Sequence, residues 1–170
     1  TITVNHTVTL IGLVTDAPLA NATVTVDLNE TTFTTSTNDL GQYRLPITID
    51  TVDIPVIVHA KGSASQANVE LIKLIGSTQS LLSLMDEERN LSAGAKNLTN
   101  ITQLSTATYL LAKDRNNNQA FSSDDDYQLE KYELSGENII NTAGFIKLLV
   151  DNPNFLIPQQ QSLLRLLDPI

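Results

Sequence analysis

Apolar and polar residues alternate along the first part of the chain with the two-residue period of a β-strand. In residues 22–28 every second side chain is apolar, and threonine or aspartate occupies the positions between them. Such a strand buries one face and exposes the other to water. Turn sequences containing Asp, Asn, Gly or Pro occupy residues 16–18 and 38–41. The pattern predicts six short strands, at residues 7–14, 22–28, 30–37, 42–49, 55–60 and 67–74.

The period of the apolar residues changes to that of an amphipathic α-helix after residue 76. Ser77 is expected to cap the first helix, because its hydroxyl can accept a backbone N–H of the first turn. The Asn152-Pro153 pair is expected to end the fourth. Helices of this length favour a small bundle. They are predicted at residues 77–85, 102–113, 124–134, 137–150 and 158–167.

Threonine and leucine are distributed unevenly along the chain. Residues 1–60 contain 14 of the 20 threonines, whereas residues 61–170 contain 19 of the 25 leucines. β-branched threonine suits a pleated sheet, and leucine loses little rotamer freedom in a helix. We therefore expect an α+β fold in which an antiparallel β-sandwich domain, residues 1–75, packs with a small α-helical domain, residues 76–170.

Two segments resemble the carboxypeptidase-regulatory-like, or transthyretin-like, β-sandwich domains. Residues 12–26 are GLVTDAPLANATVTV and resemble the Gly-x-Val-x-Asp strand, turn and Ala-x-Val strand that open that family. Residues 37–45 are TNDLGQYRL and resemble its Thr-Asp-x-x-Gly-x-Tyr/Phe turn and strand. The resemblance covers residues 7–74 and implies that Gly41 closes a hairpin while Tyr43 plugs the open end of a small sandwich.

The resemblance also carries expectations about function. Members of the family are generally not peptidases, and the fold usually accompanies an enzyme or a surface array. This copy is short for the family, so its core is expected to need cover from the helical part. Residues 97–102 and the helix after them are similar to helical modules that follow such sandwiches in bacterial envelope proteins. An extracytoplasmic location, at the cell surface, in the periplasm or outside the cell, is therefore expected.

Charge and cysteine content exclude several classes of partner and chemistry. The chain has 19 acidic and 10 basic residues and a net charge of −9, so nucleic acids and anionic membrane surfaces are poor partners. It has no cysteine, which excludes disulfides and sulfur-ligated metals. No apolar run is long enough for a membrane-spanning helix. Its first and last residues, Thr1 and Ile170, suggest a piece of a longer protein.

The sequence lacks the common catalytic signatures, so we expect a protein that is not an enzyme and that has no catalytic residues. It contains no Gly-x-Ser-x-Gly elbow, Walker phosphate loop, Gly-x-Gly-x-x-Gly or His-Glu-x-x-His motif. The two histidines, His6 and His59, lack a third ligand for zinc. His59 shares a strand face with Ile57 and is expected to bond a neighbouring residue.

One segment between two predicted helices, residues 114–125, resembles an EF-hand-like or dockerin-like calcium loop. Calcium requires six to eight hard oxygens at about 2.4 Å, and oxygen atoms recur here at the loop positions that supply them. Gln119 occupies position 6, where a sharp turn favours glycine. The candidate ligands, with the Ala120 carbonyl among them, are Asp114, Asn116, Asn118, Ala120, Ser122 and Asp125.

A second interpretation of this loop needs no metal. Ser123 can cap the following helix, and the acids at residues 124–126 can lie in its first turn, where the helix dipole favours negative charge. Residues 116–118 then form an ordinary polar loop.

Three hypotheses for the function follow. The first is a non-catalytic structural, adhesion or ligand-presenting module of a bacterial cell-envelope or secreted protein, with a protein or glycan ligand. The threonine-rich strand at residues 30–37 offers a row of hydroxyls, and as an edge strand it would expose unpaired backbone groups to another chain. The second is a calcium-dependent binding module that uses residues 114–125. The third is an accessory domain of a larger hydrolase.

Overall fold

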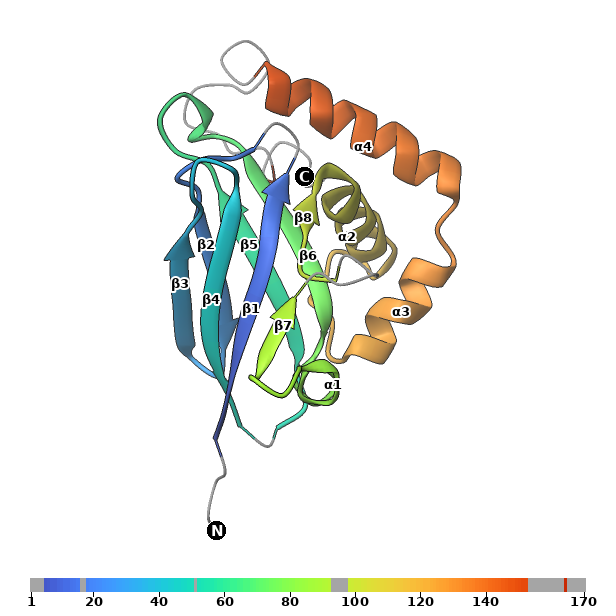
Figure 1. The fold of residues 1–170 in the computed structure, drawn as a ribbon. Coiled ribbons are helices and arrows are strands. Elements are labelled where there is room, and N and C mark those ends of the chain that lie inside the picture. Colours follow the sequence, from blue (N-terminus) through green and yellow to red (C-terminus); the bar gives the residue numbers. More distant parts are fainter. Residues whose placement is uncertain (1–4, 16–17, 51, 93–97, 153–163, 165–170) are drawn as a thin grey trace.

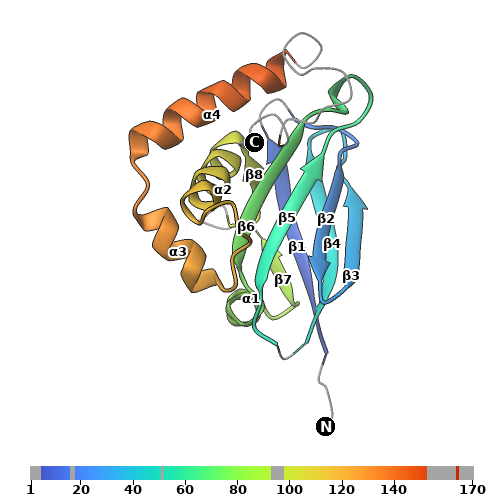
Figure 2. The same cartoon turned by 180° about the vertical axis from the view of Figure 1, so that it is seen from behind.

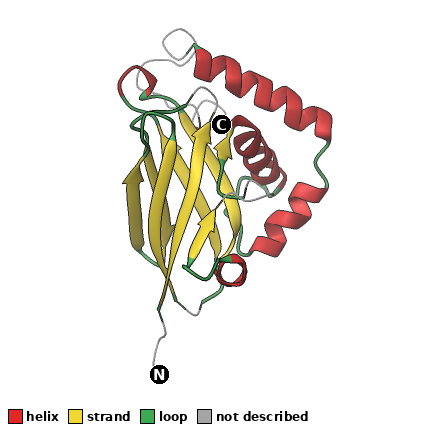
Figure 3. Cartoon of the chain, viewed as in Figure 1, coloured by secondary structure: helices red, strands yellow, loops and turns green. Residues whose placement is uncertain are grey.

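The computed structural model of the protein describes residues 5–15, 18–50, 52–92, 98–152 and 164. Within these ranges the chain forms eight strands and four α-helices (Figures 1 and 3). The strands are β1 (His6–Thr15), β2 (Thr23–Leu28), β3 (Thr31–Ser36), β4 (Gln42–Ile49), β5 (Pro55–Lys61), β6 (Glu70–Ser77), β7 (Asn90–Ser92) and β8 (Ile101–Thr102). The helices are α1 (Thr78–Leu84), α2 (Gln103–Arg115), α3 (Asp124–Tyr132) and α4 (Gly136–Asp151).

The strands form two sheets. The first has the order β4-β1-β7, with β8 also paired to β1, and the second has the order β3-β2-β5-β6. The long strands pair antiparallel, whereas β7 and β8 lie parallel to β1. Strands β1 and β4 alternate between buried and more exposed residues along most of their length, as the period-two pattern predicts. The expected α+β class is confirmed, with sheets formed mainly by antiparallel pairs.

One apolar core lies between the sheets and continues beneath the helices. The inner face of the first sheet contributes Leu10 and Ile47, and that of the second contributes Val26 and Val58. The same cluster includes Ile146 of α4. Burying one such side chain contributes about 1.5–3 kcal/mol relative to leaving it exposed. Both sheets and helices α2 and α4 therefore share this core, and a second cluster, which includes Ile72 of β6, Tyr109 of α2 and Tyr127 of α3, joins β6 to helices α2 and α3.

The helices lie beside the second sheet and beside one another. α2 packs against β6 on one side and against α3 and α4 on the other (Figures 1 and 2). α1 and α2 each begin with a capping box, in which Ser77 or Thr102 exchanges hydrogen bonds with a serine three residues later. The expected role of Ser77 as an N-cap is confirmed. Of the predicted helix at residues 158–167, all but Leu164 lies outside the described residues.

All six predicted strands are present, with ends that differ by at most three residues. Two features were not predicted. β7 and β8 come from the segment assigned to the helical domain, yet both pair with β1. The domain boundary predicted at residue 75 falls inside β6.

The turn before β4 shows why glycine occurs at residue 41. Gly41 has a φ of +74°, and an added Cβ would lie 2.5 Å from the Val14 carbonyl oxygen. The Asn38 side chain accepts the backbone N–H groups of Leu40 and Gln42 across the same turn. Tyr43 follows and is only 3% exposed, so the turn directs this ring into the core.

Candidate functional site

The segment between α2 and α3 carries the candidate calcium ligands. Asn116 ends α2, and the chain then turns through Asn117 and Asn118, whose φ angles are 54° and 59°. Asparagine tolerates this left-handed conformation better than most residues. The positive φ angles thus occur before Gln119, the position at which a glycine would be expected in a calcium loop.

The structure places the candidate ligands on a loop that is mostly exposed. Asn116 is half-buried, and its side-chain amide donates to the Gln119 carbonyl at 3.2 Å. Among the described residues, no group of three or more histidine, cysteine, aspartate or glutamate side chains is placed to hold a metal ion. The loop would therefore depend on asparagine and serine oxygens beside its two carboxylates. Five of the six candidates are exposed: Asp114, Asn118, Ala120, Ser122 and Asp125.

The end of the loop is bound to the first turn of α3. The Ser123 hydroxyl accepts the Asp126 backbone N–H at 3.1 Å, which confirms Ser123 as the helix cap. The Ser122 hydroxyl donates to the Asp126 carboxylate, and this hydrogen bond lowers the pKa of Asp126 below its usual value. Ser122 is thus already engaged by a carboxylate outside the candidate ligand set.

An aromatic cluster anchors the same loop to the two helices. Phe121 is 6% exposed and contacts Tyr127 edge-on, with ring centroids 5.2 Å apart. It also contacts Tyr109 edge-on at 5.9 Å. Such pairs contribute about 0.5–1.5 kcal/mol beyond their buried area. Phe121 is the one large apolar residue in the loop sequence, but its aromatic partners come from two separate helices and carry no local signal.

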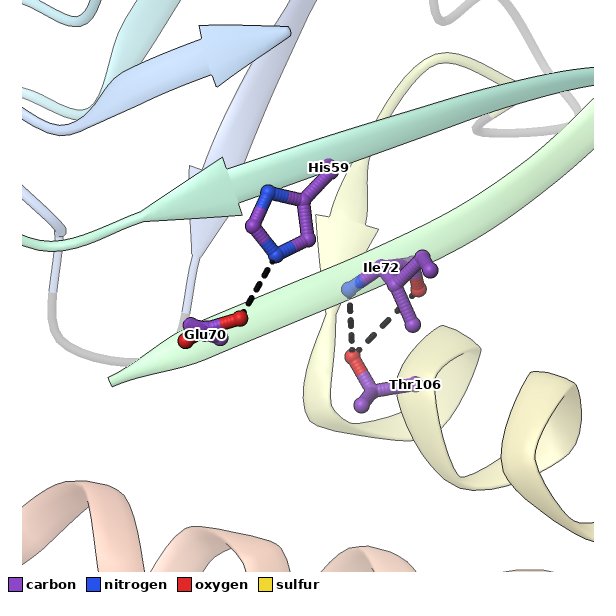
Figure 4. Close-up of polar contacts among 4 residues, drawn as sticks. All are labelled: His59, Glu70, Ile72 and Thr106. Atoms are coloured by element: carbon purple, nitrogen blue, oxygen red, sulfur yellow. Dashed lines mark hydrogen bonds and ion pairs between the residues drawn. The ribbon is translucent and has the colours of Figure 1, made fainter. Parts of the chain in front are cut away.

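The two histidines do not form a joint site. His6 begins β1 in the first sheet, and His59 lies on β5 in the second. The His59 Nε2 atom lies 2.8 Å from the Glu70 carboxylate on the neighbouring strand β6 (Figure 4). The expectation that His59 bonds a neighbour is confirmed.

Hydroxyls of α2 cover the outer edge of β6. The Ile72 backbone N–H donates to the Thr106 hydroxyl oxygen at 3.0 Å (Figure 4). The Ser105 hydroxyl donates to the Ile72 carbonyl, also at 3.0 Å. These are the backbone groups that a further strand would otherwise use. Thr106 is fully buried, so its hydroxyl holds the helix to the sheet. No feature of the sequence indicates this role, because Thr106 lies inside an ordinary helical pattern.

Buried Thr99 connects the segment before β8 to the first sheet. Its hydroxyl donates to the Ile11 carbonyl at 2.5 Å, and its own carbonyl accepts the Tyr43 hydroxyl at 2.6 Å. Gly12 makes this approach possible, because a Cβ there would lie 2.4 Å from the Thr99 carbonyl oxygen. The buried polar groups of this region therefore join elements to one another.

The sheet edges differ in how they are protected. β6 is covered by α2, β7 has three residues, and β4 carries Pro46 and Arg44, which disfavour further pairing. β3 stands at the end of its sheet and has six uncharged residues with no proline. Its register against β2 is continuous, and Thr32 and Thr34 are exposed. Among the described strands, β3 is the long edge without these protective features.

No family model, curated protein or solved structure matches the chain. None of the helices in the described ranges is long and apolar enough to cross a membrane.

Proposed function

We propose that this chain is a non-catalytic structural and ligand-presenting module of a bacterial cell-envelope or secreted protein. The resemblance of residues 12–26 and 37–45 to carboxypeptidase-regulatory-like domains supports this assignment, and so does the packing of two sheets over one core. The polar groups at Thr99 and Thr106 also support it, because they connect elements of the fold. A transthyretin-like sandwich is part of the proposal, as is an extracytoplasmic location.

The observation that carries the proposal is the unprotected edge of β3. An exposed row of backbone donors and acceptors can pair with an extended segment of another protein, which is the β-strand addition used by several peptide-binding domains. The threonine hydroxyls of β3 add hydrogen-bonding groups that suit a polar ligand, including a glycan. We therefore expect an extended, uncharged peptide segment to be the preferred ligand.

Selection from a displayed library of random peptides on the immobilised full chain tests this proposal. Peptides rich in β-branched residues should be enriched, and Thr34→Lys should abolish their binding, because a charge on an edge strand opposes pairing. Thr48→Lys is the matched control, since Thr48 is exposed on β4 in the other sheet. The proposal would be contradicted if the selected peptides still bound the Thr34→Lys variant, or if no peptides were enriched on the wild-type chain.

A calcium-dependent module is the second candidate, because the oxygen-bearing residues of the loop lie together between two helices. Calcium titration by calorimetry tests it, with the expectation of weak, millimolar binding from only two carboxylates. Binding should raise the melting temperature and should be lost in Asp114→Ala. Glu87→Gln, which removes an exposed acid outside the loop, is the control and should bind as the wild type does. Absence of heat in the wild type eliminates this candidate.

A further inference from the structure

A pocket of about 680 Å³ lies on the outer face of the first sheet and extends to the end of β3. Ile11 and Leu13 of β1 alternate with buried residues and form its apolar floor. In the register of the sheet, Ile11 lies between Arg44 of β4 and Ser92 of β7 (Figure 1). Ligand pockets in proteins commonly measure about 300–1,000 Å³, so the space is sufficient for a peptide side chain and part of its backbone.

The rim of this pocket joins the first sheet to the edge strand β3. Thr35 and Ser36 are the last two residues of β3, and they line the pocket together with Gln42 and Arg44 at the start of β4. A strand that pairs with β3 would therefore enter the pocket where β3 ends. The first side chain beyond the paired segment could then reach Arg44 while the backbone of the peptide remains on β3.

Arg44 gives the pocket a positive charge that is not balanced by an acidic residue. It is the only charged residue among the described residues that line the pocket. Its guanidinium donates to the Asn90 side-chain oxygen at 3.1 Å, and this oxygen is a neutral acceptor. Within the described part of the chain no ion pair joins Arg44 to an aspartate or glutamate, although the sequence has 19 acidic residues. A guanidinium binds a carboxylate through two parallel N–H groups, so the pocket is suited to an acidic side chain.

We propose that this pocket binds the carboxylate of an acidic residue in the peptide that pairs with β3, with the Arg44 guanidinium as the hydrogen-bond donor. The inference rests on the proposed function and specifies its ligand, in which an uncharged segment on β3 is followed by an aspartate or glutamate. The methylene groups of that residue would lie over the apolar floor formed by Ile11 and Leu13. Because only one end of β3 adjoins Arg44, the charge also determines the direction in which the peptide pairs.

Parallel peptide selections on the full-length wild type, on Arg44→Gln and on Lys61→Gln test this proposal. Peptides enriched on the wild type should carry an acidic residue at a fixed distance on one side of the β-branched segment. Arg44→Gln should enrich the same segment without the acidic residue. Lys61→Gln is the control and should retain the acidic preference, because it removes an exposed cation outside the pocket.

The selections separate this proposal from the proposed function. Enriched peptides that lack an acidic residue at a fixed position would overturn the carboxylate site and leave the β3 edge as a peptide-binding surface. An acidic preference that persists in Arg44→Gln would also overturn the site. Absence of any enriched peptide on the wild type would overturn both proposals.

The affinities of two synthetic peptides measure the contribution of the charge. The peptides have one selected sequence and differ only in the acidic residue, which the second peptide replaces with its amide counterpart. By fluorescence anisotropy, the amide peptide should bind the wild type about fivefold more weakly, and the difference should shrink at high ionic strength. Both peptides should bind Arg44→Gln equally, at an unchanged melting temperature, because Arg44 is exposed. Equal affinity of the two peptides for the wild type would contradict the proposal.

Discussion

At the scale of single residues, threonine has two different roles in this protein. The number of threonines in the sequence does not show which residue has which role. On β3, residues Thr31, Thr32 and Thr34 are exposed, as the strand propensity of threonine on a solvent-facing strand predicts. At Thr99 and Thr106 the hydroxyl is buried and bonds backbone groups of distant segments. Nothing in the neighbouring sequence distinguishes these two, because their partners lie more than 30 residues away. The surface role was predictable and the joining role was not.

The Thr106 hydroxyl provides the clearest test of that joining role. Thr106→Val keeps the shape of the side chain but leaves the Ile72 N–H without an acceptor. We expect the free energy of unfolding to fall by about 1–3 kcal/mol, the cost of an unsatisfied buried donor. Thr108→Val is the matched control on the same helix, where the hydroxyl bonds only the Leu104 carbonyl. Denaturant unfolding should show a change of about 0.5 kcal/mol or less for the control; equal losses in both variants would refute the role.

Lys73 gives a pH-dependent prediction. Its pKa in the folded protein is about 8, below the usual lysine value of 10.5, so the fold disfavours the charged form. Below pH 8 the Lys73 ammonium is protonated in both the folded and the unfolded protein, so its burial destabilises the fold fully. As the pH rises from 8 toward 10.5, the folded protein loses this proton before the unfolded protein does, and the destabilisation disappears. Lys73→Met should therefore stabilise the protein at neutral pH by about 1 kcal/mol, a value reduced for solvent screening.

The measurement for Lys73 is urea unfolding across a pH series. The advantage of Lys73→Met over the wild type should shrink between about pH 8 and pH 10.5. Lys113→Met is the comparison, because Lys113 is also a half-buried lysine but lies on α2. A constant difference between Lys73→Met and the wild type across this range would contradict the prediction.

At the scale of elements, the periodicity of apolar residues alone located the long strands and the helices. The alternation along β4, for example, gave its ends at Gln42 and Ile49 without error. β7 and β8 escaped prediction because strands of three and two residues are too short to show a period. Their pairing depends on tertiary contacts, since the segment that contains Thr99 must lie directly beside β1.

Substitutions of two glycines test this arrangement, and they are expected to change the stability of the protein in opposite directions. Gly12→Ala places a Cβ 2.4 Å from the Thr99 carbonyl oxygen, so it should push β8 away from β1 and destabilise the protein by about 1–3 kcal/mol. Gly144→Ala lies on α4 with open space around the new Cβ, so it should stabilise the helix by about 0.5–1 kcal/mol. Thermal unfolding of the two variants measures both signs. A neutral Gly12→Ala would mean that the close approach is not required.

At the scale of the whole molecule, the sheets and helices are connected by one apolar core and by buried hydroxyls. Ile101 of β8, Ala107 of α2 and Ile146 of α4 belong to the same cluster as the inner faces of both sheets. The sequence predicted which residues are apolar, but it could not predict that one cluster would include residues of both sheets and of helices α2 and α4. The candidate loop at residues 114–125 was located from local spacing. A pocket lined by Lys73 and Tyr127 could not be located in this way, because four separate segments of the chain form it.

We infer from the shared core that the sheets and the helices unfold as a single cooperative unit. Native-state hydrogen exchange of the full chain tests it most directly, because it gives the free energy of opening at each backbone amide. We expect the central amides of β2, β5 and α2 to open with the same free energy, and we expect Thr106→Val to lower all of these free energies equally. A free energy for α2 that is about 2 kcal/mol or more below that of the strands would contradict it and favour two separate domains that meet near residue 75.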